Sequence, residues 1–192
     1  MKIYKLGEEI LRQKCVDVNP EEINDEFRAF IDDMFETMIG ANGCGLAAPQ
    51  VGVAKRFFVL IADDDVRRVF INPQILKTSA ELESYEEGCL SIPGFSENIS
   101  RPASVSVTAL DQNGKRFTIE NATGLLARTI QHENDHLDGI LYIDHGDKKF
   151  AEDTITQFQK RKERAEKKAL EKERKRLSIQ AKIAARKAKK EK

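Results

Sequence analysis

The chain has 192 residues, and 32 lysines and arginines balance 32 aspartates and glutamates. That length suits one compact domain, and no run of 18 apolar residues occurs that could form a membrane-spanning helix. The three cysteines cannot all pair, and no apolar signal segment opens the sequence, so we expect free thiols in a soluble, cytoplasmic protein. The neutral total conceals an asymmetry, because residues 148–192 hold 18 basic and 7 acidic residues, a surplus of 11. Such a basic segment is typical of contact with an anionic partner.

An amphipathic helix is predicted near the N-terminus. Asn19 suits the N-cap, Pro20 suits the first helical position, and Glu22 completes a capping box. Apolar residues then recur at helical spacing from Ile23 to Met38, until glycines appear at positions 40 and 43. One face of this helix should therefore pack on the core.

Further along the chain, four segments have the composition of strands: residues 57–62, 69–76, 103–110 and 116–121. Residues 111–114 form a turn sequence, so the last two strands should make a hairpin. A second helix begins near Thr123 or Gly124 and ends at Gly139. Lys, Arg, Glu and Ala dominate from residue 154 onward and favour a further helix. These elements predict an α+β domain over residues 1–150 and a basic helical extension over residues 151–192.

The second helix carries the most informative pattern of the chain. Residues 132–136 have the form H-E-x-x-H, which places His132 and His136 on one helical face with Glu133 beside them. Two imidazoles on one face can bind a metal ion, and an adjacent carboxylate can carry a proton. The pattern therefore predicts metal-assisted hydrolysis.

A catalytic metal ion usually has a third protein ligand. Tyr142 occupies the position where some zinc peptidases have a histidine, whereas Glu152 and Glu163 lie in or beside the charged tail. His145 has the surroundings of a turn residue. Cys89 follows a glycine and an acidic residue, so it is the better candidate for the third ligand.

Three segments of the sequence resemble the signature segments of the bacterial peptide deformylases. They are residues 43–50 (G-C-G-L-A-A-P-Q), 87–91 (E-G-C-L-S) and 131–139 (Q-H-E-N-D-H-L-D-G), in the family's order and spacing. The resemblance covers about residues 1–150. It implies an α+β metallohydrolase in which antiparallel or mixed sheets surround the H-E-x-x-H helix. The implied substrates are formyl-methionyl nascent peptides, from which the enzyme releases formate.

The resemblance also implies roles for individual residues. One divalent metal ion, with iron(II) expected and zinc, nickel or cobalt possible, would be held by Cys89, His132 and His136. Glu133 would carry the proton, while the Gln50 side chain and the Leu90 N–H would hold the oxyanion. The implied substrate-binding residues are Cys44, Gly45, Tyr85, Gly88, Leu125, Arg128 and Thr129. The backbone of Cys44, Gly45 and Gly88 would pair with the peptide as an added strand. The basic C-terminal helix would dock on the ribosome, and no membrane contact is implied.

Two other functions remain compatible with the residues. A metallopeptidase that cuts internal bonds would need a third ligand downstream and would leave Cys89 without a role. A non-catalytic binder of ribosomes or RNA would use the basic tail, and its structural metal would have a closed fourth ligand. Cys44, where family members more often have an aliphatic residue, is the spare thiol near these motifs.

Overall fold

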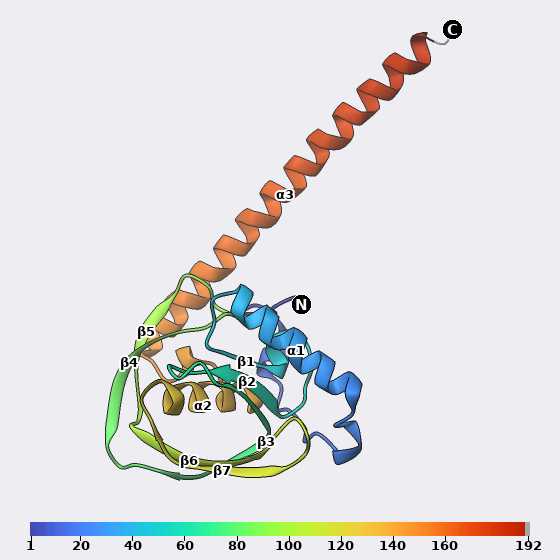
Figure 1. The fold of residues 1–192 in the computed structure, drawn as a ribbon. Coiled ribbons are helices and arrows are strands. Elements are labelled where there is room, and N and C mark those ends of the chain that lie inside the picture. Colours follow the sequence, from blue (N-terminus) through green and yellow to red (C-terminus); the bar gives the residue numbers. More distant parts are fainter. Residues whose placement is uncertain (191–192) are drawn as a thin grey trace. The chain divides into compact units, whose positions relative to one another are not determined.

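The computed structural model describes the backbone of residues 1–190 and the side chains of residues 1–180 (Figure 1). The chain divides into two compact units, Met1–Glu152 and Asp153–Lys192. The first unit contains every strand of the described range, and the described part of the second, residues 153–190, belongs to helix α3 (Lys148–Lys190). Within the described range, no helix is both long enough and apolar enough to cross a membrane.

The larger sheet has five antiparallel strands in the order β1-β2-β3-β6-β7. Their bounds are Gly45–Ala47 (β1), Phe57–Ile61 (β2), Arg67–Thr78 (β3), Ser104–Leu110 (β6) and Arg116–Thr123 (β7). The four strands predicted from the sequence are confirmed, and β6 and β7 form the predicted hairpin, with Leu110 opposite Arg116. β1 was not predicted, because three residues are too few to show a pattern.

A second, two-stranded antiparallel sheet consists of β4 (Leu82–Gly88) and β5 (Ser96–Pro102), with Gly88 opposite Ser96. Its strands were not predicted from the sequence. Along β4 every side chain except that of Glu87 is exposed, so no alternation of apolar and polar residues marks the strand.

Helix α1 (Asp25–Gly40) confirms the predicted amphipathic helix, but the predicted start at Pro20 is wrong. The Asn19 N–H does donate to the Glu22 carboxylate, at 2.7 Å, but this capping sequence closes only the short 3₁₀ helix η2 (Pro20–Glu22). Asn24 then caps α1, since its side chain accepts a backbone N–H of the first turn at 2.9 Å. Two capping sequences stand in tandem, and only the second begins the long helix.

Helix α2 (Gly124–Leu137) begins where the sequence predicts, and the strands lie around it (Figure 1). It contacts β1, β2, β6 and β7. Its core face packs into a cluster of fully buried side chains that includes Phe58, Phe70, Val107, Ile130 and Leu137. The antiparallel sheets around this helix confirm the predicted α+β class.

The remaining short helices are η1 (Glu9–Arg12), η3 (Ala48–Val51) and η4 (Tyr142–Asp144). Gly139, with a φ of +74°, follows the end of α2, and a Cβ there would lie 2.6 Å from the Arg12 carbonyl oxygen. Only glycine fits both conditions, so this residue fixes where the chain leaves the helix.

Candidate active site

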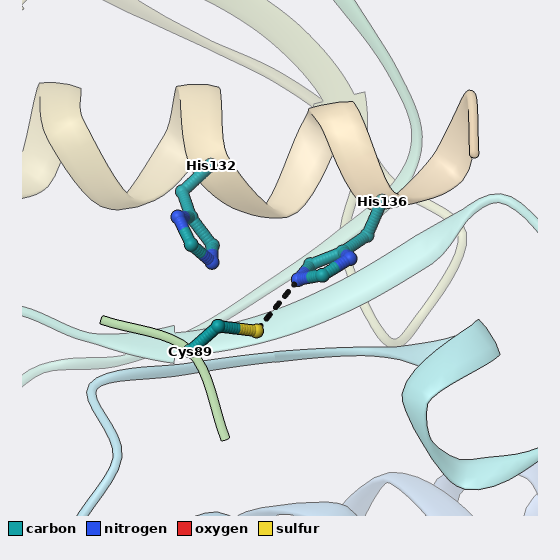
Figure 2. A group of neighbouring side chains, drawn as sticks. All are labelled: Cys89, His132 and His136. Atoms are coloured by element: carbon teal, nitrogen blue, oxygen red, sulfur yellow. Dashed lines mark hydrogen bonds between the residues drawn. The ribbon is translucent and has the colours of Figure 1, made fainter. Parts of the chain in front are cut away.

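Two imidazoles from α2 and a thiol from the segment after β4 converge in the first unit (Figure 2). The Cys89 Sγ lies 3.3 Å from His136 Nε2, and the ligand atoms of Cys89, His132 and His136 all lie within 4.8 Å of one another. Two ligands on one tetrahedral ion, with bonds of about 2.3 Å to sulfur and about 2.1 Å to nitrogen, lie about 3.6 Å apart. The three donors therefore fit a single metal ion.

This group has three donors, and none of the other histidines, cysteines or carboxylates in the described range belongs to it. Cys44 is exposed, and its Sγ lies 3.6 Å from Thr129 Oγ1. The His145 ring contacts Asp135 instead of the donor group. Three protein ligands would leave one coordination position of a bound ion open, as catalytic sites require and closed structural sites do not. Neither a fourth thiol ligand nor a downstream carboxylate ligand has support here.

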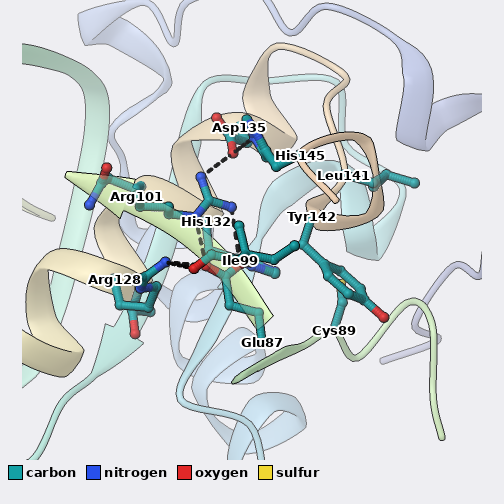
Figure 3. A network of polar contacts seen from close by, with 12 residues as sticks. Glu87, Cys89, Ile99, Arg101, Arg128, His132, Asp135, Leu141, Tyr142 and His145 are labelled. Atoms are coloured by element: carbon teal, nitrogen blue, oxygen red, sulfur yellow. Dashed lines mark hydrogen bonds and ion pairs between the residues drawn. The ribbon is translucent and has the colours of Figure 1, made fainter. Parts of the chain in front are cut away.

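Glu87 lies behind His132 and accepts four hydrogen bonds (Figure 3). Its Oε1 accepts from Arg101 Nε at 2.7 Å and from Arg128 Nη1 at 2.9 Å. Its Oε2 accepts from Arg101 Nη2 at 3.0 Å and from His132 Nδ1 at 2.9 Å. Because the carboxylate only accepts, His132 carries its proton on Nδ1 and has the Nε2 lone pair available for a metal ion.

The charged groups around His132 favour a positive charge at its ring. Burial raises the pKa of Glu87, but the hydrogen bonds from His132 and Arg101 outweigh it and hold that pKa well below its usual range. Burial lowers the pKa of His132, but the contacts with Cys89 and Glu87 outweigh it and leave the pKa well above the ordinary value. The pKa of His136 lies well below its ordinary value because of burial and the nearby His132. A divalent ion would satisfy the same attraction without a proton.

Glu133 lies beside the donors and is buried. Burial raises the pKa of Glu133 to about 7, which suits a group that both accepts and donates a proton near neutral pH. Its Oε2 has no hydrogen-bond partner among the residues that the structure describes. A Cβ at Gly45 would collide with Glu133 Oε1 and lie 2.7 Å from Thr129 Cγ2. Glycine at position 45 therefore makes room for this carboxylate.

Gln50 presents its amide to the donor group from η3. Its Oε1 accepts the Ala47 N–H at 2.8 Å, so the amide nitrogen points the other way and lies 3.4 Å from Cys89 Sγ. Leu90 follows the cysteine, and its carbonyl accepts a hydrogen bond from Lys5 Nζ at 2.6 Å. Both segments that carry the predicted oxyanion donors are thus fixed by hydrogen bonds.

A cavity of about 340 Å³ opens beside these groups. Its walls include every site residue predicted from the sequence except His136, which is almost fully buried. The lining residues from that prediction are Cys44, Gly45, Gln50, Tyr85, Gly88, Cys89, Leu90, Leu125, Arg128, Thr129, His132 and Glu133. Arg128 has a further task, since its guanidinium group is held by Glu87 and by the Ile99 and Glu83 carbonyls.

β1 is the terminal strand of its sheet and borders this cavity. The Cys44 carbonyl accepts the Ile61 N–H at 2.9 Å and so faces β2. Successive carbonyls along a strand point to opposite sides, so the Gly45 carbonyl faces the free edge. An extended peptide could therefore pair with the backbone of Gly45. The expected pairing of a peptide with the Cys44 backbone is wrong for its carbonyl, which is bound to β2, and Cys44 presents its side chain to the cavity.

Two residues of this site were missed in the sequence analysis. Glu87 stands in the E-G-C-L-S segment, so its place beside Cys89 was a usable signal. Arg101 carries no such signal, because it reaches Glu87 only through the pairing of β4 with β5, in which it lies opposite Glu83.

A cysteine and two imidazoles that can hold a metal ion, next to a buried carboxylate, are typical of a metal-dependent hydrolase. The sequence profile of the polypeptide deformylase family matches residues 1–151. A peptide deformylase of Treponema pallidum is 51% identical over 158 residues, which cover 82% of this chain and 95% of that protein. One of Fusobacterium nucleatum is 50% identical over 143 residues, covering 74% and 82%.

Solved structures agree with these sequence matches. The crystal structure of a peptide deformylase from Synechococcus elongatus in complex with actinonin has a TM-score of 0.75 and 41% identity, covering 81% of this chain and 85% of that chain. One from Ehrlichia chaffeensis, also with actinonin, has a TM-score of 0.79 and 36% identity, covering 84% and 96%. The chain therefore belongs to the peptide deformylase family, whose members are metal-dependent hydrolases that remove the formyl group from the N-termini of nascent polypeptides. The resemblance stated from the three motifs is confirmed.

Proposed function

We propose that residues 1–150 form the catalytic domain and that Cys89, His132 and His136 hold one divalent metal ion. The main support for this proposal is the group of three donors beside Glu133. The buried Oε2 of Glu133 lacks a hydrogen-bond partner among the described residues. Iron(II) is the ion that the family resemblance implies, and a thiolate with two imidazoles also suits zinc, nickel or cobalt. When bound, the ion acts as a Lewis acid toward the formyl carbonyl and the attacking water.

The protein groups carry the proton and the developing negative charge. Glu133 accepts a proton from the attacking water and donates it to the nitrogen of the leaving amine. The amide nitrogen of Gln50 and the backbone N–H of Leu90 donate to the formyl oxygen as it gains charge. Formate and a free amino terminus are the products.

The substrate lies along the free edge of β1. The backbone groups of Gly45 and Gly88 pair with the extended peptide as an added strand. The methionine side chain enters the cavity, between the side chains of Cys44, Tyr85, Leu125, Arg128 and Thr129. The enzyme acts in the cytoplasm, and its basic extension, residues 151–192, contacts the ribosome while the nascent chain emerges.

Formate release from a short formyl-methionyl peptide tests this assignment, with metal content measured on the same preparations. Glu133→Gln should retain the metal ion and lose between about 100-fold and 10,000-fold of turnover, because the amide cannot accept the proton. Glu120→Gln makes the same chemical change at an exposed position of β7 and should behave as the wild type. Near wild-type formate release from Glu133→Gln would refute the role of Glu133.

A further inference from the structure

The hydrogen-bond network behind His132 continues to the partly exposed side chain of His145 (Figure 3). His145, directly after η4, places its Nε2 2.7 Å from Asp135 Oδ2. Arg101 Nη1 lies 2.6 Å from the same oxygen. Asp135 stands on α2 next to His136 but has no part in the donor group. His145 therefore contacts the metal site only through other side chains.

Arg101 joins the two halves of this network. Its Nη1 binds Asp135, and its Nε and Nη2 bind the two oxygens of Glu87 at 2.7 and 3.0 Å. A planar guanidinium group held on both sides has little freedom to rotate. The Glu87 carboxylate that binds this guanidinium group also accepts a hydrogen bond from His132 Nδ1. Any loosening at Asp135 thus changes how firmly His132 is oriented.

We propose that His145 is a positioning residue for the metal site, which holds Asp135 and through it keeps the Arg101–Glu87 pair aligned on His132. This inference rests on the proposed role of His132 as a metal ligand. It assigns a task to a histidine that no deformylase motif of the sequence includes. Outer groups of this kind orient metal-binding imidazoles and set how tightly the ion is held.

The side chains in this series of contacts become less exposed to solvent from His145 inward. The His145 side chain is 36% exposed and that of Asp135 is 18% exposed, whereas Arg101 and Glu87 are buried. His145 can therefore exchange protons with solvent while the inner groups cannot. Both the neutral ring and the imidazolium can donate from Nε2, but a charged donor makes a stronger bond to a carboxylate.

Other charged groups lie near His145, its sequence neighbours or its partner Asp135. Asp144 precedes it and is paired with Arg12 of η1. Glu97 of β5 lies near Gly146, since its Cγ would be 3.6 Å from a Cβ placed there. Asp135 and Arg101 complete the surroundings from α2 and β5. Among these groups, Asp135 is the one that pairs with His145 Nε2.

Two substitutions separate the hydrogen bond from the charge. His145→Phe keeps a ring but removes the donor, and His145→Gln keeps a donor but cannot become charged. The full-length chain is loaded with cobalt(II), and transfer of cobalt to a chelator is timed at pH 6 and pH 8. Absorption of the cobalt–thiolate pair reports the environment of the ion before release. Asp64→Asn, which breaks an exposed ion pair with Arg68 elsewhere, serves as the control.

His145→Phe should release cobalt faster at both pH values, by about 3-fold to 10-fold, somewhat less than the loss typical of a group that contacts the ligand directly. His145→Gln keeps a hydrogen-bond donor toward Asp135 and should therefore release cobalt more slowly than His145→Phe at both pH values. Release at the wild-type rate from both variants at both pH values would overturn the inference. Equal acceleration in His145→Phe and His145→Gln, with a parallel loss of thermal stability, would reduce His145 to a structural role and also overturn the inference. Failure of the wild type to bind cobalt would instead refute the proposed metal site itself.

Discussion

Replacement of Glu87 by glutamine tests whether the buried ion network supports the metal site. The substitution keeps the shape of the side chain but removes its charge and turns one acceptor oxygen into a donor. Four hydrogen bonds from three side chains reach the carboxylate, from Arg101, Arg128 and His132. At least one of these donors would then face an N–H₂ group instead of an oxygen.

The magnitude follows from burial. Glu87, Arg101 and Arg128 are all buried, so loss of the carboxylate leaves two guanidinium groups with less than their full counter-charge. Removal of one partner of a buried ion pair costs about 3 to 5 kcal/mol of unfolding free energy. Loss of the group that orients a metal-binding histidine typically costs about 10-fold to 100-fold in metal affinity. Glu87→Gln should show both effects.

Denaturant unfolding of metal-depleted protein measures the first effect, and competition with a chelator measures the second. Glu86→Gln is the matched control, because Glu86 is the preceding residue of β4 and its carboxylate accepts only from the exposed side of the strand, from Ser96 Oγ at 2.6 Å. Equal unfolding midpoints and equal metal affinity for the two variants would refute the reasoning about the network.

Three further outcomes are expected at the cysteines. Cys89→Ser should lose metal and activity together, because a hydroxyl is a poor ligand beside two imidazoles, and unchanged metal content after dialysis would contradict its ligand role. Cys44→Ile should keep the metal and most turnover while it changes the preference among formyl peptides with different first side chains, and loss of metal would contradict a pocket role. Burial raises the pKa of Cys15 to about 11, so iodoacetamide at pH 8 should label exposed Cys44 in the native protein and Cys15 only after unfolding. Mass spectrometry distinguishes the two sites, and rapid native labelling of Cys15 would contradict its burial.

Local patterns predicted the parts of this protein that depend on neighbours in sequence. The spacing of His132 and His136 placed both on one face of α2, and the structure has them there. The hairpin of β6 and β7 followed from its turn sequence in the same way. Periodicity also gave the core face of α1, because a helix repeats its environment every three to four residues.

Pairings between distant segments were beyond such patterns. Arg101 meets Glu87 because β4 and β5 pair, and the exposed, polar residues of β4 gave no strand signal. The predicted start of α1 was wrong for a different reason. Two capping sequences compete, and the backbone geometry between them decides which one caps the helix. His145 had the sequence surroundings of a turn residue, and only the fold brings Asp135 within reach of its ring.

The basic extension yields the last prediction, because its surplus of 11 positive charges motivates an anionic partner. Its acidic residues are concentrated in the first half, whereas residues 174–192 hold nine basic residues and one acidic residue. Side chains from residue 161 to residue 180 are exposed along α3. Contacts between such side chains and phosphates release counterions, so binding weakens as the salt concentration rises. Each contact with a single strand contributes about −0.7 to the slope of log K against log salt.

Truncation after Lys162 should therefore weaken co-sedimentation with ribosomes and flatten its dependence on salt. Truncation after Glu173 removes only the most basic part and should have most of the same effect. Both cuts lie beyond Thr154 and Phe158, which are the buried side chains of this helix within the described range, so turnover of a short formyl-methionyl peptide should persist. Equal ribosome binding with and without the segment would make it a solvated extension. A collapse of peptide turnover after either cut would instead place the segment within the catalytic fold, because a free peptide substrate requires no contact with the ribosome.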